Sequence, residues 1–149
     1  MTPEQILGFM RVHRYAVQAS ATPSGTPQAA VVGVAITDQF EIIFDTLGTT
    51  RKAQNLRQDP HVAFVIGGTV DGEERTVQYE GIADEPEGDE RTRIQQTYFA
   101  RFPDGPGRLS WPGITYFRVR PTWMRYSDFS GEPPVILEFN PEQLKHANW

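Results

Sequence analysis

The sequence predicts a mainly β fold, in which about eight short antiparallel strands and a few short helices close into a barrel. Three observations support this. Segments with alternating apolar and polar residues recur along the chain. Turn-forming clusters, drawn from 13 glycines and 12 prolines, separate them. Helical periodicity is confined to three short stretches. No repeat or long linker divides the 149 residues, so we expect a single domain over 1–149.

The first half of the chain begins with a helix signal. Thr2 can cap a first turn, Pro3 suits the first helical position, and Gln5 completes a capping box, so we expect a helix to about Arg14. Three consecutive antiparallel strands are predicted next, over Tyr15 to Ala21, Gln28 to Thr37 and Phe40 to Phe44. A second helix is predicted over Thr49 to Gln58, ended by Asp59-Pro60.

The second half alternates strands with one longer helix. The predicted strands are His61 to Ile66, Glu73 to Ala83, Ile114 to Arg120, Trp123 to Ser127 and Val135 to Phe139. The predicted helix covers Glu87 to Phe102 and is stopped by Pro103.

Composition excludes several classes of protein. The chain has no cysteine, so disulfides and thiolate chemistry are absent. The net charge is −5 and the pI is about 5.2, which disfavours a nucleic-acid partner. The longest apolar run is too short to span a membrane, and the first residues lack the pattern of a secretory signal. We therefore expect a cytoplasmic protein with no membrane partner.

The segment Thr49-Thr50-Arg51-Lys52 carries the strongest chemical signal. It follows a strand and a glycine turn and opens a helix, where free backbone N–H groups and the helix dipole favour an anion. The hydroxyls add hydrogen bonds, Arg51 can grip phosphate with two N–H groups, and Lys52 adds charge. The alternative is a solvated first turn in which both cations pair with nearby carboxylates.

The string from Thr50 to Phe64, Thr-Arg-Lys-Ala-Gln-Asn-Leu-Arg-Gln-Asp-Pro-His-Val-Ala-Phe, resembles the pyridoxamine 5′-phosphate oxidase-like family of FMN-binding split β-barrels. The resemblance extends to Ala29–Ala35, Glu74–Gln78 and Phe117–Pro121. It implies an antiparallel split barrel of the FMN-binding type. It also implies a homodimer with two FMN sites at the interface, each built from both chains.

The resemblance also implies a role for particular residues. The phosphate and ribityl chain of FMN would be held by Asp45, Thr46, Thr49, Thr50, Arg51 and Lys52. The Asp45 carboxylate would have to bond a ribityl hydroxyl or point away. Main-chain groups of Val31 and Val32 would face the isoalloxazine ring. Thr76 or Gln78 would reach the ring edge, and Tyr126 would lie over the flavin. The alternative for Gln78 and Tyr126 is that they are ordinary surface or core residues of a strand.

The true oxidase carries a C-terminal Arg-x-His motif, and Pro133 to Phe139 contains neither residue, so we expect a relative with another activity. The resemblance favours an FMN-dependent oxidoreductase acting on a small organic molecule, with the flavin supplying the chemistry. Two alternatives stay open: a deazaflavin-dependent reductase, because Asn55 to Pro60 also resembles such relatives, and a non-catalytic flavin- or haem-binding module linked to stress responses.

Other chemistry is not indicated by the sequence. His13, His61 and His146 are far apart and lack accompanying acidic residues, so we expect structural histidines and no metal site. No G-x-S-x-G motif is present to suggest a serine hydrolase.

Overall fold

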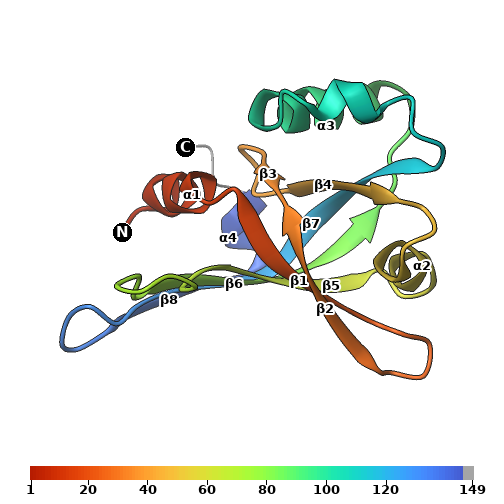
Figure 1. Cartoon of the computed structure of the whole chain (residues 1–149). Helices are drawn as coiled ribbons and strands as arrows, with labels where there is room; N and C mark the ends of the chain where they lie inside the picture. The colour runs from red at the N-terminus through yellow and green to blue at the C-terminus, as the bar shows by residue number, and fades with distance from the viewer. Residues whose placement is uncertain (146–149) are drawn as a thin grey trace.

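The computed structural model describes residues 1–145 and shows one strongly curled antiparallel sheet partly covered by helices (Figure 1). The helices are α1 (Pro3–Val12), α2 (Arg51–Gln58), α3 (Gly88–Arg101), the 3₁₀ helix η1 (Gly105–Arg108) and α4 (Pro141–Lys145). The strands are β1 (Tyr15–Ala21), β2 (Pro27–Gly33), β3 (Ala35–Ile36), β4 (Ile42–Leu47), β5 (His61–Gly67), β6 (Arg75–Asp84), β7 (Ile114–Asp128) and β8 (Val135–Phe139). The predicted split-barrel class is confirmed.

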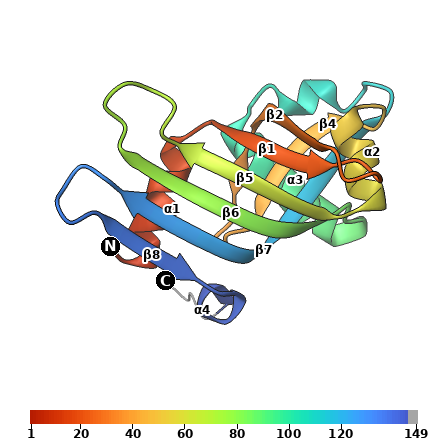
Figure 2. The same ribbon diagram turned by 90° about the horizontal axis from the view of Figure 1, so that it is seen from below.

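The strand order is β2-β1-β5-β6-β7-β4-β3, and β8 also pairs with β7. One edge of β7 is shared, since β4 pairs with Ile114–Val119 and β8 pairs with Met124–Asp128. Seen from below, strands β1, β5, β6, β7 and β8 present one continuous outer face (Figure 2). The barrel is therefore split where β7 leaves β4 and meets β8.

The prediction of two strands around Pro121 was wrong, because β7 runs through this residue. The pairing of β6 with β7 shifts in register at this point, between Glu80 and Gly81. Pro121 lies between the stretches paired with β4 and β8, where a missing N–H is tolerated. Glycine is required at position 81, beside the register shift, because a Cβ there would lie 2.5 Å from the Arg120 carbonyl oxygen.

The predicted three-strand run also needs correction. The segment from Gln28 to Thr37 is divided into β2 and β3. The Val34 N–H still donates to the Arg14 carbonyl at 3.0 Å, and from Ala35 the chain pairs with β4 instead of β1. Strand β4 begins at Ile42 rather than Phe40, and it pairs with β3 and β7. Helices η1 and α4 were not predicted, since a helix of four or five residues leaves too short a pattern to detect.

Helix α1 begins as predicted, with the capping box between Thr2 and Gln5 formed in both directions. Its buried side chains, among them Ile6 and Met10, pack into the core inside the curled sheet. A second, smaller core cluster, which includes Ile43, Tyr98 and Tyr116, fixes α3 against β4 and β7. Within residues 1–145, no helix is long and apolar enough to cross a membrane.

Candidate functional site

The start of α2 is organised by two threonines. Thr50 is the N-cap: its hydroxyl accepts from the Ala53 N–H at 3.3 Å and donates to the Leu47 carbonyl at 2.9 Å. Thr46, at the end of β4, lies 3.0 Å from Thr50, hydroxyl to hydroxyl. Thr49 is exposed beside them. The sequence thus folds a strand, a turn and a capped helix so that hydroxyls meet where the dipole favours an anion.

The two cations of this turn have no carboxylate partner. Arg51 is exposed and Lys52 is half-buried, and neither makes an ion pair with any carboxylate in residues 1–145. The first turn of α2 contains no acidic residue. Positive charge at a helix N-terminus is unfavourable unless an anion offsets it, so the alternative of two internally paired cations does not hold.

A chain of polar side chains lies beneath Arg51. Asn55, on the buried side of α2, lies 3.1 Å from the Ser20 hydroxyl and 2.7 Å from the carboxamide of Gln28. The other end of that carboxamide lies 2.8 Å from the Arg51 guanidinium. Because a guanidinium only donates, the Gln28 oxygen faces Arg51. Strands β1 and β2 therefore position the arginine from below.

These side chains enclose a small hollow of about 180 Å³, lined by Gln18, Ser20, Gln28, Ala29, Ala30, Arg51 and Lys52. Its donors are a guanidinium, an ammonium, a hydroxyl and carboxamides, a set suited to a phosphate group. Sites that enclose a whole small molecule measure about 300–1,000 Å³. The hollow therefore fits the phosphate end of a cofactor, and a ring system attached to it must lie outside.

The outer face of the sheet beside the hollow carries a row of valines. Val31 on β2 is opposite Val17 on β1, which is opposite Val65 on β5. Val31 is 68% exposed and Val65 is 41% exposed. The same row continues through Gln78 on β6, which is exposed. We call Val17, Val31 and Val65 the valine row.

Three predicted site residues lie away from this group. Val32 is buried and points into the core, although its main chain remains in β2. Tyr126 is 1% exposed and packs edge-on against Phe9 in the core. Thr76 is half-buried beside Gly68 near the start of β6. Their side chains do not join the cluster formed by Thr46, Thr50, Arg51 and Lys52.

Asp45 faces the opposite side of β4 from Thr46. Its carboxylate accepts from the Tyr98 hydroxyl at 3.0 Å and from Arg108 Nε at 2.9 Å. Burial and the Asp45 charge raise the pKa of Tyr98 above its usual range. Asp45 thus connects β4 with α3 and η1.

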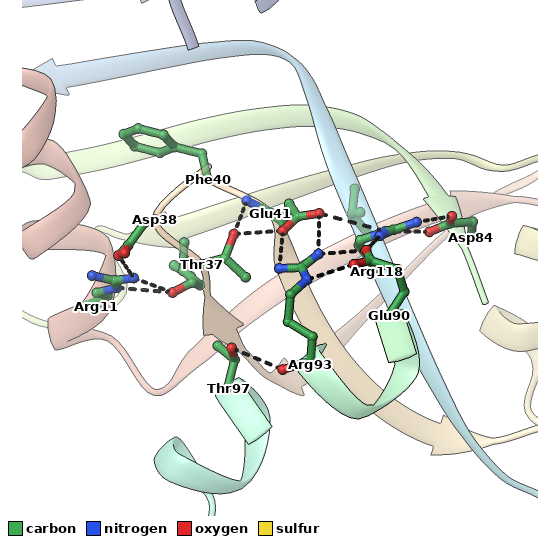
Figure 3. A network of polar contacts seen from close by, with 12 residues as sticks. Arg11, Thr37, Asp38, Phe40, Glu41, Asp84, Glu90, Arg93, Thr97 and Arg118 are labelled. Atoms are coloured by element: carbon green, nitrogen blue, oxygen red, sulfur yellow. Dashed lines mark hydrogen bonds and ion pairs between the residues drawn. The ribbon is translucent and has the colours of Figure 1, made fainter. Parts of the chain in front are cut away.

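A larger hollow, about 510 Å³, lies elsewhere and is bordered by Glu41, Glu90, Arg93 and Arg120. Its charges pair with one another: Arg93 bonds Glu41 at 3.0 Å and Glu90 at 3.0 Å (Figure 3). Arg118 joins the same network through Asp84 and Glu90. Arg120, the remaining cation, lies 3.9 Å from Asp84. The charged side chains that border this larger hollow are therefore paired, whereas Arg51 and Lys52 below α2 are not, within residues 1–145.

Each of the two described histidines has an oxygen partner near it in the sequence. His13 Nδ1 lies 2.9 Å from the Phe9 carbonyl, and His61 Nδ1 lies 2.7 Å from Asp59. No group of three potential metal ligands occurs among residues 1–145. His146 lies outside the described residues.

The family model described as pyridoxamine 5′-phosphate oxidase matches residues 2–128. The chain belongs to this family. No curated protein matches the sequence.

Solved structures share the fold of this pyridoxamine 5′-phosphate oxidase family member. A haem-binding protein from Mycobacterium smegmatis superposes with a TM-score of 0.82 at 15% identity, covering 97% of this chain and 60% of that chain. An FMN-binding protein related to the oxidase, from Nostoc punctiforme, gives 0.69 at 15% identity, covering 96% and 94%. A conserved hypothetical protein from Mycobacterium tuberculosis gives 0.70 at 27% identity, covering 86% and 85%. The family fold thus accompanies both FMN-binding and haem-binding proteins.

The sequence did not point to the polar residues that lie below the segment from Thr49 to Lys52: Gln18, Ser20, Gln28 and Asn55. A signal existed in β1, where Gln18 and Ser20 share one face with the buried Ala16. Polar residues in the inward phase of a strand point to a polar interior. The inward and outward positions of β1 and β2 could not be told apart from the sequence, because both strands contain many alanines and alanine suits either face of a sheet.

Proposed function

We propose that this chain binds FMN and that its phosphate occupies the hollow below α2. The observation that carries the proposal is the pair Arg51 and Lys52, two cations without a carboxylate partner in residues 1–145 beside the hydroxyls of Thr46 and Thr50. A phosphate monoester carries nearly two negative charges and three acceptor oxygens. It would offset the cations and the dipole of α2 together.

The ring system would lie on the main chain of β2, beside Val31. The exposed valine row supports this placement, since flavin sites are apolar around the ring. Bound flavin supplies hydride and electron chemistry itself. The chain would bind the phosphate, provide an apolar surface for the ring and exclude water from it. The proposed activity is that of an oxidoreductase acting on a small organic molecule.

A second copy of the chain would complete this site. The hollow encloses only the phosphate end, and the valine row leaves apolar surface open beside it. Gln78 lies three strands from Val31 in the same row, a separation of about 14 Å at the usual strand spacing. We therefore assign Gln78 to the ring edge of the partner's flavin in a homodimer with two sites.

The test compares FMN with riboflavin, which lacks the phosphate. Arg51→Ala should weaken FMN binding by at least tenfold while riboflavin affinity changes little, because Arg51 would contact the phosphate and no other part of the ligand. Gln54→Ala, an exposed position on the same helix, should leave both affinities unchanged. An equal loss for both ligands in Arg51→Ala would remove the phosphate assignment.

The visible absorption spectrum of the purified protein separates the cofactor classes. Flavin bands support FMN, a Soret band identifies haem, and competitive titration distinguishes deazaflavin from FMN. A colourless protein that takes up no FMN on titration would end the proposal.

A further inference from the structure

Gln18 is a buried polar side chain whose amide has no partner. It is 1% exposed, and its Nε2 has no hydrogen-bond partner among residues 1–145. An unmade hydrogen bond at a buried amide costs free energy of folding. Ser20, two residues along β1, is also buried but lies within 3.1 Å of Asn55. Within β1 the missing partner is thus particular to Gln18; among residues 1–145 the Tyr116 hydroxyl on β7 is also buried and unpaired, but Tyr116 does not line the hollow below α2.

The surroundings explain why the amide is unsatisfied. Gln18 lies on the inward face of β1, where its register neighbours are Ala30 on β2 and Phe64 on β5. Neither side chain can accept a hydrogen bond. Alanine at position 30 also leaves space, and both Gln18 and Ala30 line the hollow that Arg51 and Lys52 border.

A buried donor without a partner, on a side chain that lines a hollow bordered by two cations, indicates that the partner is an anionic acceptor. Stability alone would favour an apolar residue at this inward position. Buried polar groups without a hydrogen-bond partner concentrate at functional sites.

We propose that Gln18 is a phosphate-binding residue whose Nε2 donates to a phosphate oxygen from the floor of the hollow, opposite Arg51 and Lys52. This inference rests on the proposed function, because it requires a phosphate-bearing ligand below α2. It assigns a neutral donor from β1 to a site whose charge comes from α2. The hydrogen bond from the Gln18 amide is directional, so it selects an acceptor oxygen at one position in the hollow. Lys52 acts mainly through its charge.

The experiment uses the full chain freed of ligand, with Gln18→Leu as the main variant and Gln96→Leu, on an exposed position of α3, as the control. The melting temperature is measured without ligand and with inorganic phosphate, and the affinities for FMN and riboflavin are measured by flavin fluorescence. Gln18→Leu should raise the melting temperature of the free protein, because it removes an unpaired donor. It should weaken FMN at least tenfold, the size of a hydrogen bond to a charged group, and leave riboflavin within threefold. Phosphate should stabilise the original chain and Gln96→Leu but not Gln18→Leu.

The opposite changes in stability and affinity separate a binding role from a structural one. A lower melting temperature for ligand-free Gln18→Leu would mean that the amide supports the fold, and it would overturn the inference. The same holds if Gln18→Leu keeps FMN affinity within threefold while Arg51→Ala loses it, and in that case FMN binding itself still stands. If FMN fails to bind the original chain but phosphate stabilises it through Gln18, the flavin proposal fails and the phosphate role of Gln18 survives. Failure of both ligands to bind overturns both.

Discussion

Glu41 and Arg93 face each other through two hydrogen bonds, with Nη1 donating to Oε1 at 3.0 Å and Nη2 donating to Oε2 at 3.2 Å (Figure 3). Glu41 comes from the turn before β4, and Arg93 from α3. The Glu41 side chain is 9% exposed and also accepts from the Thr37 hydroxyl at 3.0 Å. This pair therefore ties the covering helix to the sheet from a largely buried position.

Replacing this carboxylate should destabilise the fold. Glu41→Ala removes the buried carboxylate that accepts two hydrogen bonds from Arg93 and lies 3.7 Å from the buried Arg118, and we expect the free energy of unfolding to fall by about 3 kcal/mol. Asp38→Ala removes the exposed partner of Arg11 and should cost less than about 1 kcal/mol. Urea unfolding followed by tryptophan fluorescence measures both. Equal small losses would show that the network adds nothing to stability.

The fold and part of the site were predictable from the sequence because local signals agreed with the tertiary structure. The capping box at Thr2 and the segment at Thr50 are local, and both formed as expected. The position of Asp45 was not predictable, because its direction depends on alternation along β4 and on Tyr98, which is distant in sequence. The absence of a partner for Gln18 depends in the same way on the register of three strands.

Thr50 has two separable roles, a helix cap and a neighbour of the anion. Thr50→Ala should lower the free energy of unfolding by about 1 kcal/mol through loss of the cap. Thr50→Asp keeps a capping oxygen but places a negative charge beside the hollow, so stability should be nearly retained while FMN affinity falls at least tenfold. Chemical unfolding and FMN titration give the two readings, with Thr50→Ser as the control that preserves both. If Thr50→Asp binds FMN normally, the phosphate does not lie at this helix start.

The valine row is the surface where we expect the proposed second copy to bind. Val31→Glu places a charge in the centre of the proposed interface and should convert a dimer into a monomer at micromolar concentration, with loss of FMN. Val12→Glu is a matched control, because Val12 is 77% exposed at the end of α1, away from this face. Sedimentation equilibrium measures the mass of each variant. A dimer that survives Val31→Glu would place the interface elsewhere.

Buried tyrosines predict a loss of stability in alkaline solution. Burial raises the pKa of Tyr79 well above its usual value, and burial with the charge of Asp45 raises the pKa of Tyr98. In both cases the folded state retains a proton that the unfolded chain loses above about pH 10. The stability they contribute is therefore complete below pH 10 and falls as pH rises further, by up to about 1.4 kcal/mol per pH unit for each tyrosine. Urea unfolding at pH 8 to 11 measures the slope, which Tyr79→Phe should reduce and Tyr15→Phe, at an exposed position, should not. A flat profile would contradict the prediction.

Asp45 provides the clearest separation of fold from cofactor binding, because its neighbours in sequence belong to the proposed phosphate site while its contacts do not. Asp45→Ala removes the acceptor of Arg108 Nε and of the Tyr98 hydroxyl, so the free energy of unfolding should fall by about 3 kcal/mol. Asp104→Ala removes the exposed second partner of the same arginine and should cost less than about 1 kcal/mol. FMN affinity, measured at a temperature where each variant is folded, should stay within threefold in both. A large loss of FMN affinity in Asp45→Ala without a loss of stability would contradict this prediction. It would mean that Asp45 binds the ribityl chain of FMN and does not stabilise the packing of α3 and η1.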